Sequence, residues 1–142
     1  MEKNFVGKRI LITGASMGLG AVCFQEFAKR GAKLAISGRT KGKLEELIKS
    51  TKDPDSHIAI ASDLSLVSNI HDFVQKGVEF LGGVDITIHA LGGGYGFSNP
   101  ILGWEQIELL HKVNLYVGVE INRLTMPKMI ENKKGTIIHV GS

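Results

Sequence analysis

Cysteine and proline are scarce in this chain, which has one cysteine and three prolines among its 142 residues. A single cysteine excludes an internal disulfide framework and favours a reducing compartment. Cys23 shares a helical stripe with Phe27, so we interpret it as a small core residue rather than a reactive thiol. With 18 glycines, 43% hydrophobic residues and 22% charged residues, the composition is typical of a soluble α/β protein and not of a disordered or fibrous one.

Long apolar runs are also missing. The uncharged stretch from Ile86 to Trp104 contains several glycines and a proline, which excludes a membrane-spanning helix there. The N-terminus has an acidic residue at position 2 and only a short apolar run, unlike a signal peptide. We therefore expect no membrane association and a cytoplasmic location.

Positive charge is present but is not concentrated. The formal net charge is +3 and the sequence pI is about 9.0. Lysines are interspersed with acids, as in KGKLEELIKS at 41–50, and aromatic residues do not alternate with basic ones. A nucleic-acid surface normally gathers its positive charge on one face, so we expect no nucleic-acid partner.

Short apolar runs alternate with stretches of helical period along the chain. Strands are predicted at 9–13, 33–37, 57–62, 84–89 and 136–140, with helices around 24–28, 44–48, 70–81 and 104–132. This alternation predicts one α/β domain over residues 1–142, a doubly wound parallel sheet with right-handed crossovers and helices on both faces.

A glycine-rich turn, TGASMGLG at 13–20, joins the first predicted strand to the first predicted helix. Gly14, Gly18 and Gly20 allow a tight turn and a close approach to a ligand, and the free amides at the helix start favour an anion. The pyrophosphate of a dinucleotide fits this position, with Ser16, Met17 and Leu19 beside it. Methyltransferases use similar turns, so the turn leaves that alternative open.

The end of the second predicted strand reads Ser37, Gly38, Arg39, Thr40. Proteins that bind NAD often have an acid here for the ribose hydroxyls, whereas an arginine can hold a 2′-phosphate through its planar fork. We therefore favour NADP (NADPH) over NAD as the cofactor, with hydroxyl help from Ser16, Ser37 or Thr40. Arg39 also disfavours S-adenosylmethionine, which has no phosphate to match it.

Asp63 and Leu64 follow the third predicted strand. An acid at this edge of a parallel sheet can accept a hydrogen bond from an adenine amino group. Asp63 can equally cap the following helix. The sequence does not decide between these two roles.

Six landmarks in a fixed order resemble the short-chain dehydrogenase/reductase family. They are TGxxxGxG at 13–20, Gly38-Arg39, Asp63-Leu64, Asn114 in HKVNL, Pro127 and Met129 in MPKM, and GTIIHVGS at 135–142. The resemblance covers the whole chain. It implies a Rossmann-type sheet with strand order 3-2-1-4-5 and a cofactor site that also includes Ala90, Leu91 and Gly92.

The resemblance also implies an activity, hydride transfer between NAD(P) and a carbonyl or hydroxyl group. Asn114 matches the family asparagine that holds a water in the proton relay, and Ser142 matches the serine that hydrogen-bonds the substrate oxygen. The tyrosine and lysine of the YxxxK motif have no counterpart in the chain. We therefore expect the sequence to be the N-terminal part of a longer single-domain enzyme, truncated after the fifth strand and inactive alone.

The chain departs from the family pattern at two histidines. His89 stands where many members have the first asparagine of Asn-Asn-Ala-Gly, and His139 stands where many have an asparagine three residues before the catalytic serine. We interpret them as a neutral structural pair, since two histidines without a third ligand make a poor metal site, and no metal is expected. The glycine-rich segment 92–100 is interpreted as a loop on the substrate side.

Two functions are compatible with the sequence. The first is an NADP-dependent oxidoreductase acting on a small carbonyl or alcohol substrate, and family members of this kind usually form dimers or tetramers. The second is a nucleotide-binding sensor or scaffold without turnover. They differ in whether the protein reduces a carbonyl once NADPH is bound.

Overall fold

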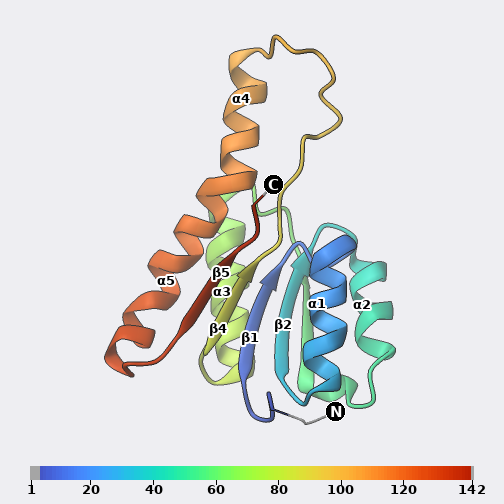
Figure 1. Cartoon of the computed structure of the whole chain (residues 1–142), viewed down its shortest axis with the longest axis vertical. Coiled ribbons are helices and arrows are strands. Elements are labelled where there is room, and N and C mark those ends of the chain that lie inside the picture. Colours follow the sequence, from blue (N-terminus) through green and yellow to red (C-terminus); the bar gives the residue numbers. More distant parts are fainter. Residues whose placement is uncertain (1–3, 142) are drawn as a thin grey trace.

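A computed structural model describes residues 4–141 and contains one five-stranded sheet. The strands are β1 Arg9–Thr13, β2 Lys33–Gly38, β3 His57–Ala61, β4 Ile86–His89 and β5 Thr136–His139. All neighbouring strands are parallel, and their order is β3-β2-β1-β4-β5. This arrangement confirms the predicted Rossmann-type fold, and the crossovers between strands place helices on both faces of the sheet (Figure 1).

The helices are α1 Gly18–Lys29, α2 Lys41–Lys49, α3 Val67–Leu81, α4 Trp104–His111 and α5 Val117–Glu131, with a short 3₁₀ turn at Pro54–Ser56. Helices α1 and α2 pack on one face of the sheet, and α3 and α5 pack on the other. Strand β1 shows why, because its side chains alternate. Ile10 and Ile12 enter the cluster beneath α1 and α2, whereas Leu11 enters the cluster beneath α3 and α5.

Helix α3 buries one face at helical spacing. Its buried residues are Ile70, Phe73, Val74, Gly77 and Leu81. Cys23 is partly buried against the cluster beneath α1 and α2. Burial raises the pKa of its thiol, which agrees with a packing role and disfavours a reactive thiolate.

The helix predicted over 104–132 is interrupted. Helix α4 and helix α5 are joined by a π-helical turn at Lys112–Tyr116. A π turn inserts one extra residue into a helix and often marks a functional site. Here it places Asn114 toward the loop that follows β4.

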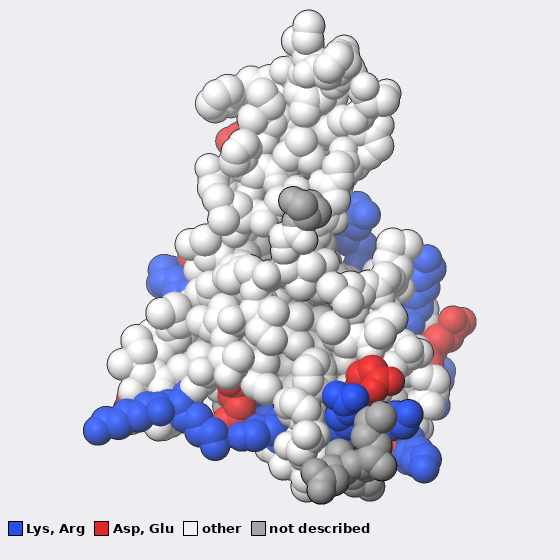
Figure 2. All heavy atoms as spheres, in the orientation of Figure 1, with Lys and Arg blue, Asp and Glu red and all other residues white. Residues whose placement is uncertain are grey.

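Helix α4 and the loop before it project beyond the carboxyl end of the sheet (Figure 1). Figure 2 shows that charged side chains gather near the opposite end of the molecule, while this projecting end is nearly free of them on the face in view. Large apolar side chains are exposed here, including Ile101 and Trp104. Within residues 4–141, no helix has both the length and the apolar character needed to cross a bilayer.

Candidate functional site

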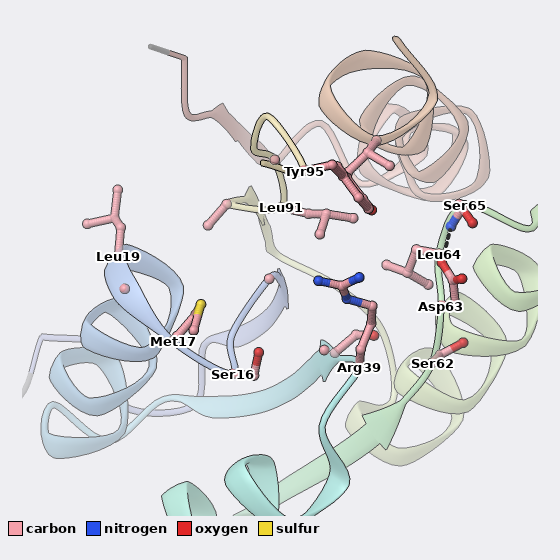
Figure 3. A pocket seen from close by; sticks show the side chains of 17 residues that line it. Ser16, Met17, Leu19, Arg39, Ser62, Asp63, Leu64, Ser65, Leu91 and Tyr95 are labelled. Atoms are coloured by element: carbon pink, nitrogen blue, oxygen red, sulfur yellow. Dashed lines mark hydrogen bonds between the residues drawn. The ribbon is translucent and has the colours of Figure 1, made fainter. Parts of the chain in front are cut away.

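A cleft of about 240 Å³ lies at the carboxyl ends of the strands. Loops that follow β1, β2, β3 and β4 all contribute to it, as does the π turn (Figure 3). Its lining comprises Gly14, Ser16, Met17, Gly18, Leu19, Ser37, Gly38, Arg39, Ser62, Asp63, Leu64, Ser65, Ala90, Leu91, Gly92, Tyr95 and Val113. Ligands of open parallel sheets bind at this edge, at the point where the strand order reverses.

The glycine turn forms one wall of the cleft. Gly14 has a φ of +69°, and a Cβ there would lie 2.6 Å from the backbone nitrogen of Leu91. Only glycine therefore allows β1 and β4 to come this close at their ends. Gly20 was predicted to bind the cofactor, but it is buried and does not line the cleft. It packs against the glycine turn, where a Cβ on Gly20 would strike the carbonyl of Gly14.

The start of α1 leaves backbone donors available. Its N-cap residue, Met17, makes no side-chain cap hydrogen bond, and its first turn has no acidic residue. The Met17 side chain therefore provides no capping acceptor for the N–H groups of the first turn, and the helix dipole adds positive potential at the same place. A phosphate group fits such a helix terminus.

The end of β2 supplies a buried hydroxyl and a cation. Ser37 Oγ is fully buried and has no hydrogen-bond partner among residues 4–141, which suits a polar ligand group. Gly38 lies against Ser16, since a Cβ on Gly38 would be 2.9 Å from the Ser16 Cβ. Arg39 is exposed and its side chain points into the cleft (Figure 3). Thr40 was predicted to contact the cofactor, but it is the N-cap residue of α2 and lies outside the cleft.

Asp63 lies in the loop between β3 and α3. Its Oδ1 accepts a hydrogen bond from the Ser65 backbone N–H at 3.0 Å. Hydrogen bonding from the Ser65 side chain, and then from this N–H, lowers the pKa of the Asp63 carboxyl, and the nearby Arg39 charge adds to the effect. The N-cap residue of α3 is Leu66, so the helix-cap role considered for Asp63 is wrong, and Asp63 instead closes the preceding turn. Asp63 and Leu64 both line the cleft.

Asn114 fastens the loop after β4 to the π turn. Its Oδ1 accepts from the Gly93 N–H at 3.0 Å, and its Nδ2 donates to the carbonyls of Gly93 at 3.0 Å and Leu110 at 2.9 Å. A Cβ on Gly92 would lie 2.7 Å from Asn114 Oδ1. Asn114 therefore determines where Ala90, Leu91 and Gly92 pass the cleft, and both of its amide protons are occupied.

A second cavity, of about 350 Å³, adjoins the first at the ends of β4 and β5. Asn114, His89 and His139 line it together with Val140 and Gly141. The predicted catalytic residue Ser142 lies outside the described residues. The described part of the second cavity thus brings Asn114 next to the two residues that precede Ser142.

The two histidines are joined through Asn122 of α5. Asn122 Oδ1 accepts from His89 Nε2 at 2.8 Å, and Asn122 Nδ2 donates to His139 Nε2 at 2.9 Å. The two rings are tilted against each other with centroids 4.5 Å apart. Gly118 gives them room, because a Cβ there would lie 2.8 Å from His139 Cε1. The amide thus assigns the protons, since His89 carries hydrogen on Nε2 and His139 does not.

The burial of two histidines, His89 and His57, predicts that the fold loses stability in mild acid. Burial lowers the pKa of His89 and, separately, that of His57. The unfolded chain therefore takes up protons below about pH 6.5 that the folded chain excludes. We expect the free energy of unfolding to be highest above that pH and to fall as the pH drops toward the lower folded pKa values.

Urea unfolding at pH 7.5 and pH 5.5 measures this loss. His89→Asn, which removes one of the two groups, should make the difference between the two pH values smaller. An equal difference in wild type and variant would contradict the role given to His89.

Four residues that line the cleft were not identified from the sequence. Ser62 and Ser65 flank the Asp63-Leu64 pair, and their position at the end of a predicted strand and just beyond it was a usable signal. Val113 comes from the π turn, which periodicity does not reveal. Tyr95 belongs to the loop assigned to the substrate side, but the fold brings it into the cleft beside Arg39.

Comparison with known proteins identifies the family of the chain. The short chain dehydrogenase family model matches residues 8–142. The chain is 30% identical to very-long-chain 3-oxoacyl-CoA reductase of Rattus norvegicus over 151 aligned positions, covering 99% of this chain and 48% of that protein. It is 28% identical over 140 residues to ketoacyl reductase HetN of Nostoc sp., covering 98% and 49% respectively.

A solved structure has the same fold. It is 7 alpha-hydroxysteroid dehydrogenase complexed with NADH and 7-oxo glycochenodeoxycholic acid, with a TM-score of 0.87, 23% identity, and coverage of 96% of this chain and 53% of that chain. The chain belongs to the short-chain dehydrogenase/reductase family. It spans about half the length of the curated relatives it matches.

Proposed function

We propose that this protein is an NADP-dependent oxidoreductase that transfers hydride between the nicotinamide and a carbonyl or hydroxyl substrate. The observation that carries the proposal is Arg39, which points into the cleft beside the glycine turn and forms no ion pair within residues 4–141. An unpaired arginine fork next to an anion-binding helix start is suited to a second phosphate. No acidic residue stands at this position to hold the ribose hydroxyls of NAD.

Each part of the cleft has a task in this proposal. The N–H groups at the start of α1 hold the pyrophosphate, with Gly14, Gly18 and the exposed Met17 and Leu19 beside it. Arg39 binds the 2′-phosphate, and the buried Ser37 hydroxyl hydrogen-bonds the ribose. Asp63 accepts a hydrogen bond from the adenine amino group. The bound dinucleotide would supply the hydride.

The reacting end of the site lies by the second cavity. Asn114 would hold a water for proton transfer. Its Oδ1 accepts only one described hydrogen bond, so the second lone pair of this oxygen is available to the water. Ser142 would donate a hydrogen bond to the substrate oxygen, where negative charge develops as hydride reaches the carbon. The relatives named as 3-oxoacyl-CoA and ketoacyl reductases favour a ketone on an acyl chain as the substrate class.

The experiment is carbonyl-dependent oxidation of NADPH by the protein purified from its source, with a panel of ketones that includes 3-oxoacyl thioesters. Oxidation that needs both NADPH and a ketone supports the proposal. Tight NADPH binding with no ketone reduced would favour a sensor or scaffold instead. No NADPH binding would contradict both functions.

We also propose that the protein is cytoplasmic and works as a homo-oligomer. The observation that supports a homo-oligomer is the set of exposed apolar side chains along α5, namely Val119, Met126 and Ile130. Isolated exposed apolar residues are common, but a row on one helix is typical of an interface. Light scattering on the purified protein should give a dimer or tetramer, and a monomer at micromolar concentration would contradict this.

A further inference from the structure

Tyr95 occupies a turn that does not suit its residue type. The carbonyl of Gly94 accepts a hydrogen bond from the Phe97 N–H at 3.0 Å. The two residues between them, Tyr95 and Gly96, have φ values of +54° and +71°. Positive φ at both central positions defines a type I′ turn, where Gly, Asn and Asp dominate. A tyrosine there costs backbone energy that another contact must offset.

The turn at Tyr95 follows a residue, Gly93, that is hydrogen-bonded to the π turn. Gly93, two residues before Tyr95, is bound through both its N–H and its carbonyl to Asn114. The Tyr95 ring is also stacked near Phe97, with centroids 6.3 Å apart and planes 26° apart. The loop is therefore fastened on the side of the π turn and presents one aromatic ring over the cleft (Figure 3).

The contact on the cleft side is with Arg39. The central guanidinium carbon of Arg39 lies 5.4 Å from the centroid of the Tyr95 ring, within the range of a cation–π interaction. Such a contact holds the guanidinium beside the ring without a carboxylate partner, so its N–H donors can bind an oxyanion. Arg39 forms no ion pair in the described part of the chain, and Asp63 acts on it only from a distance.

We propose that Tyr95 is a specificity-determining residue for the phosphorylated cofactor. Its ring holds the Arg39 guanidinium over the cleft, so that the N–H donors are already in place when a ribose 2′-phosphate enters. The inference rests on the proposed function, because it assumes that Arg39 receives that phosphate. It adds that a residue of the loop after β4, which Asn114 fastens, takes part in the choice between NADPH and NADH.

A different role for the ring leads to a different result. If Tyr95 served as a stacking platform for adenine, its loss would weaken both cofactors alike, since both contain adenine. If it orients Arg39, its loss weakens only the cofactor with the 2′-phosphate. The ratio of the two dissociation constants therefore separates these roles.

The test compares Tyr95→Leu and Tyr95→Phe with wild type by titration with NADPH and with NADH. We expect Tyr95→Leu to weaken NADPH by about two- to fivefold, the value of an exposed cation–π contact, with NADH unchanged. Tyr95→Phe keeps the ring and should stay close to wild type. Tyr116→Leu, which removes the other tyrosine of the chain, is the matched control and should change neither constant. Unchanged melting temperatures show that the variants are folded.

A double-mutant cycle completes the test. In an Arg39→Ala background, Tyr95→Leu should have no further effect on NADPH. Equal losses for NADPH and NADH, or an unchanged NADPH constant in Tyr95→Leu, would overturn the inference while leaving NADP preference in place. A wild-type protein that does not prefer NADPH would refute the proposed function itself, and this inference would fall with it.

Discussion

Replacing Arg39 with alanine should weaken NADPH binding by about ten- to hundredfold, because a hydrogen bond to a charged group contributes about 1.5 to 3 kcal/mol. NADH, which lacks the 2′-phosphate, should bind almost as before. The loss arises from the missing guanidinium fork, which is the group suited to the 2′-phosphate. Calorimetric titration of both cofactors into wild type and variant measures it.

Two further variants make the result specific. Arg39→Lys keeps the charge but not the bidentate geometry, so it should lose part of the NADPH affinity. Lys41→Ala removes a nearby cation that is paired with Glu45 at 3.6 Å, and it should leave both cofactors unchanged. Equal weakening of NADPH and NADH in Arg39→Ala would refute the phosphate assignment.

Gly20→Ala should be the most damaging single substitution in the first unit of the fold. The new Cβ would strike the carbonyl of Gly14 and come within 2.7 Å of its carbonyl carbon. Both are backbone atoms of the turn that forms the cleft wall, so neither can move without displacing the turn. We expect a loss of at least about 2 kcal/mol in the free energy of unfolding, as for an overpacked core, together with a severe loss of NADPH binding.

Gly42→Ala is the matched control for this prediction. Gly42 also lies in a helix, α2, but a Cβ there would meet nothing within 4 Å. Alanine should therefore stabilise that helix, by up to about 1 kcal/mol. Urea denaturation of the two variants compares the effects directly, and a Gly20→Ala protein as stable as wild type would contradict the close packing described here.

The layered fold could be predicted from the sequence because its signals are local. The isoleucine-rich strands, the glycine turn and the helical stripe of α3 each depend on residues close together in the chain. Boundaries were less accurate where a tertiary contact decides them. The strand predicted from Val84 begins at Ile86, since Asp85 is held by Arg9 through hydrogen bonds of 3.0 Å and 3.1 Å.

The parts of the site that the sequence did not predict depend on contacts between distant segments. The π turn is fastened by Asn114 to Gly93, 21 residues away. The position of Tyr95 depends on a turn with positive φ at a tyrosine, which turn preferences disfavour. Gly20 had the correct motif spacing but a different task, since the motif does not distinguish a glycine that touches the ligand from one that packs beneath the turn.

The most direct test of the account is a titration of the purified wild-type protein with NADPH and, in parallel, with NADH. We predict saturable binding of NADPH that is about tenfold tighter than that of NADH or better, the difference that one charge-assisted contact supplies. No binding of NADPH at millimolar concentration, or equal affinity for the two cofactors, would contradict the assignment of the cleft and of Arg39.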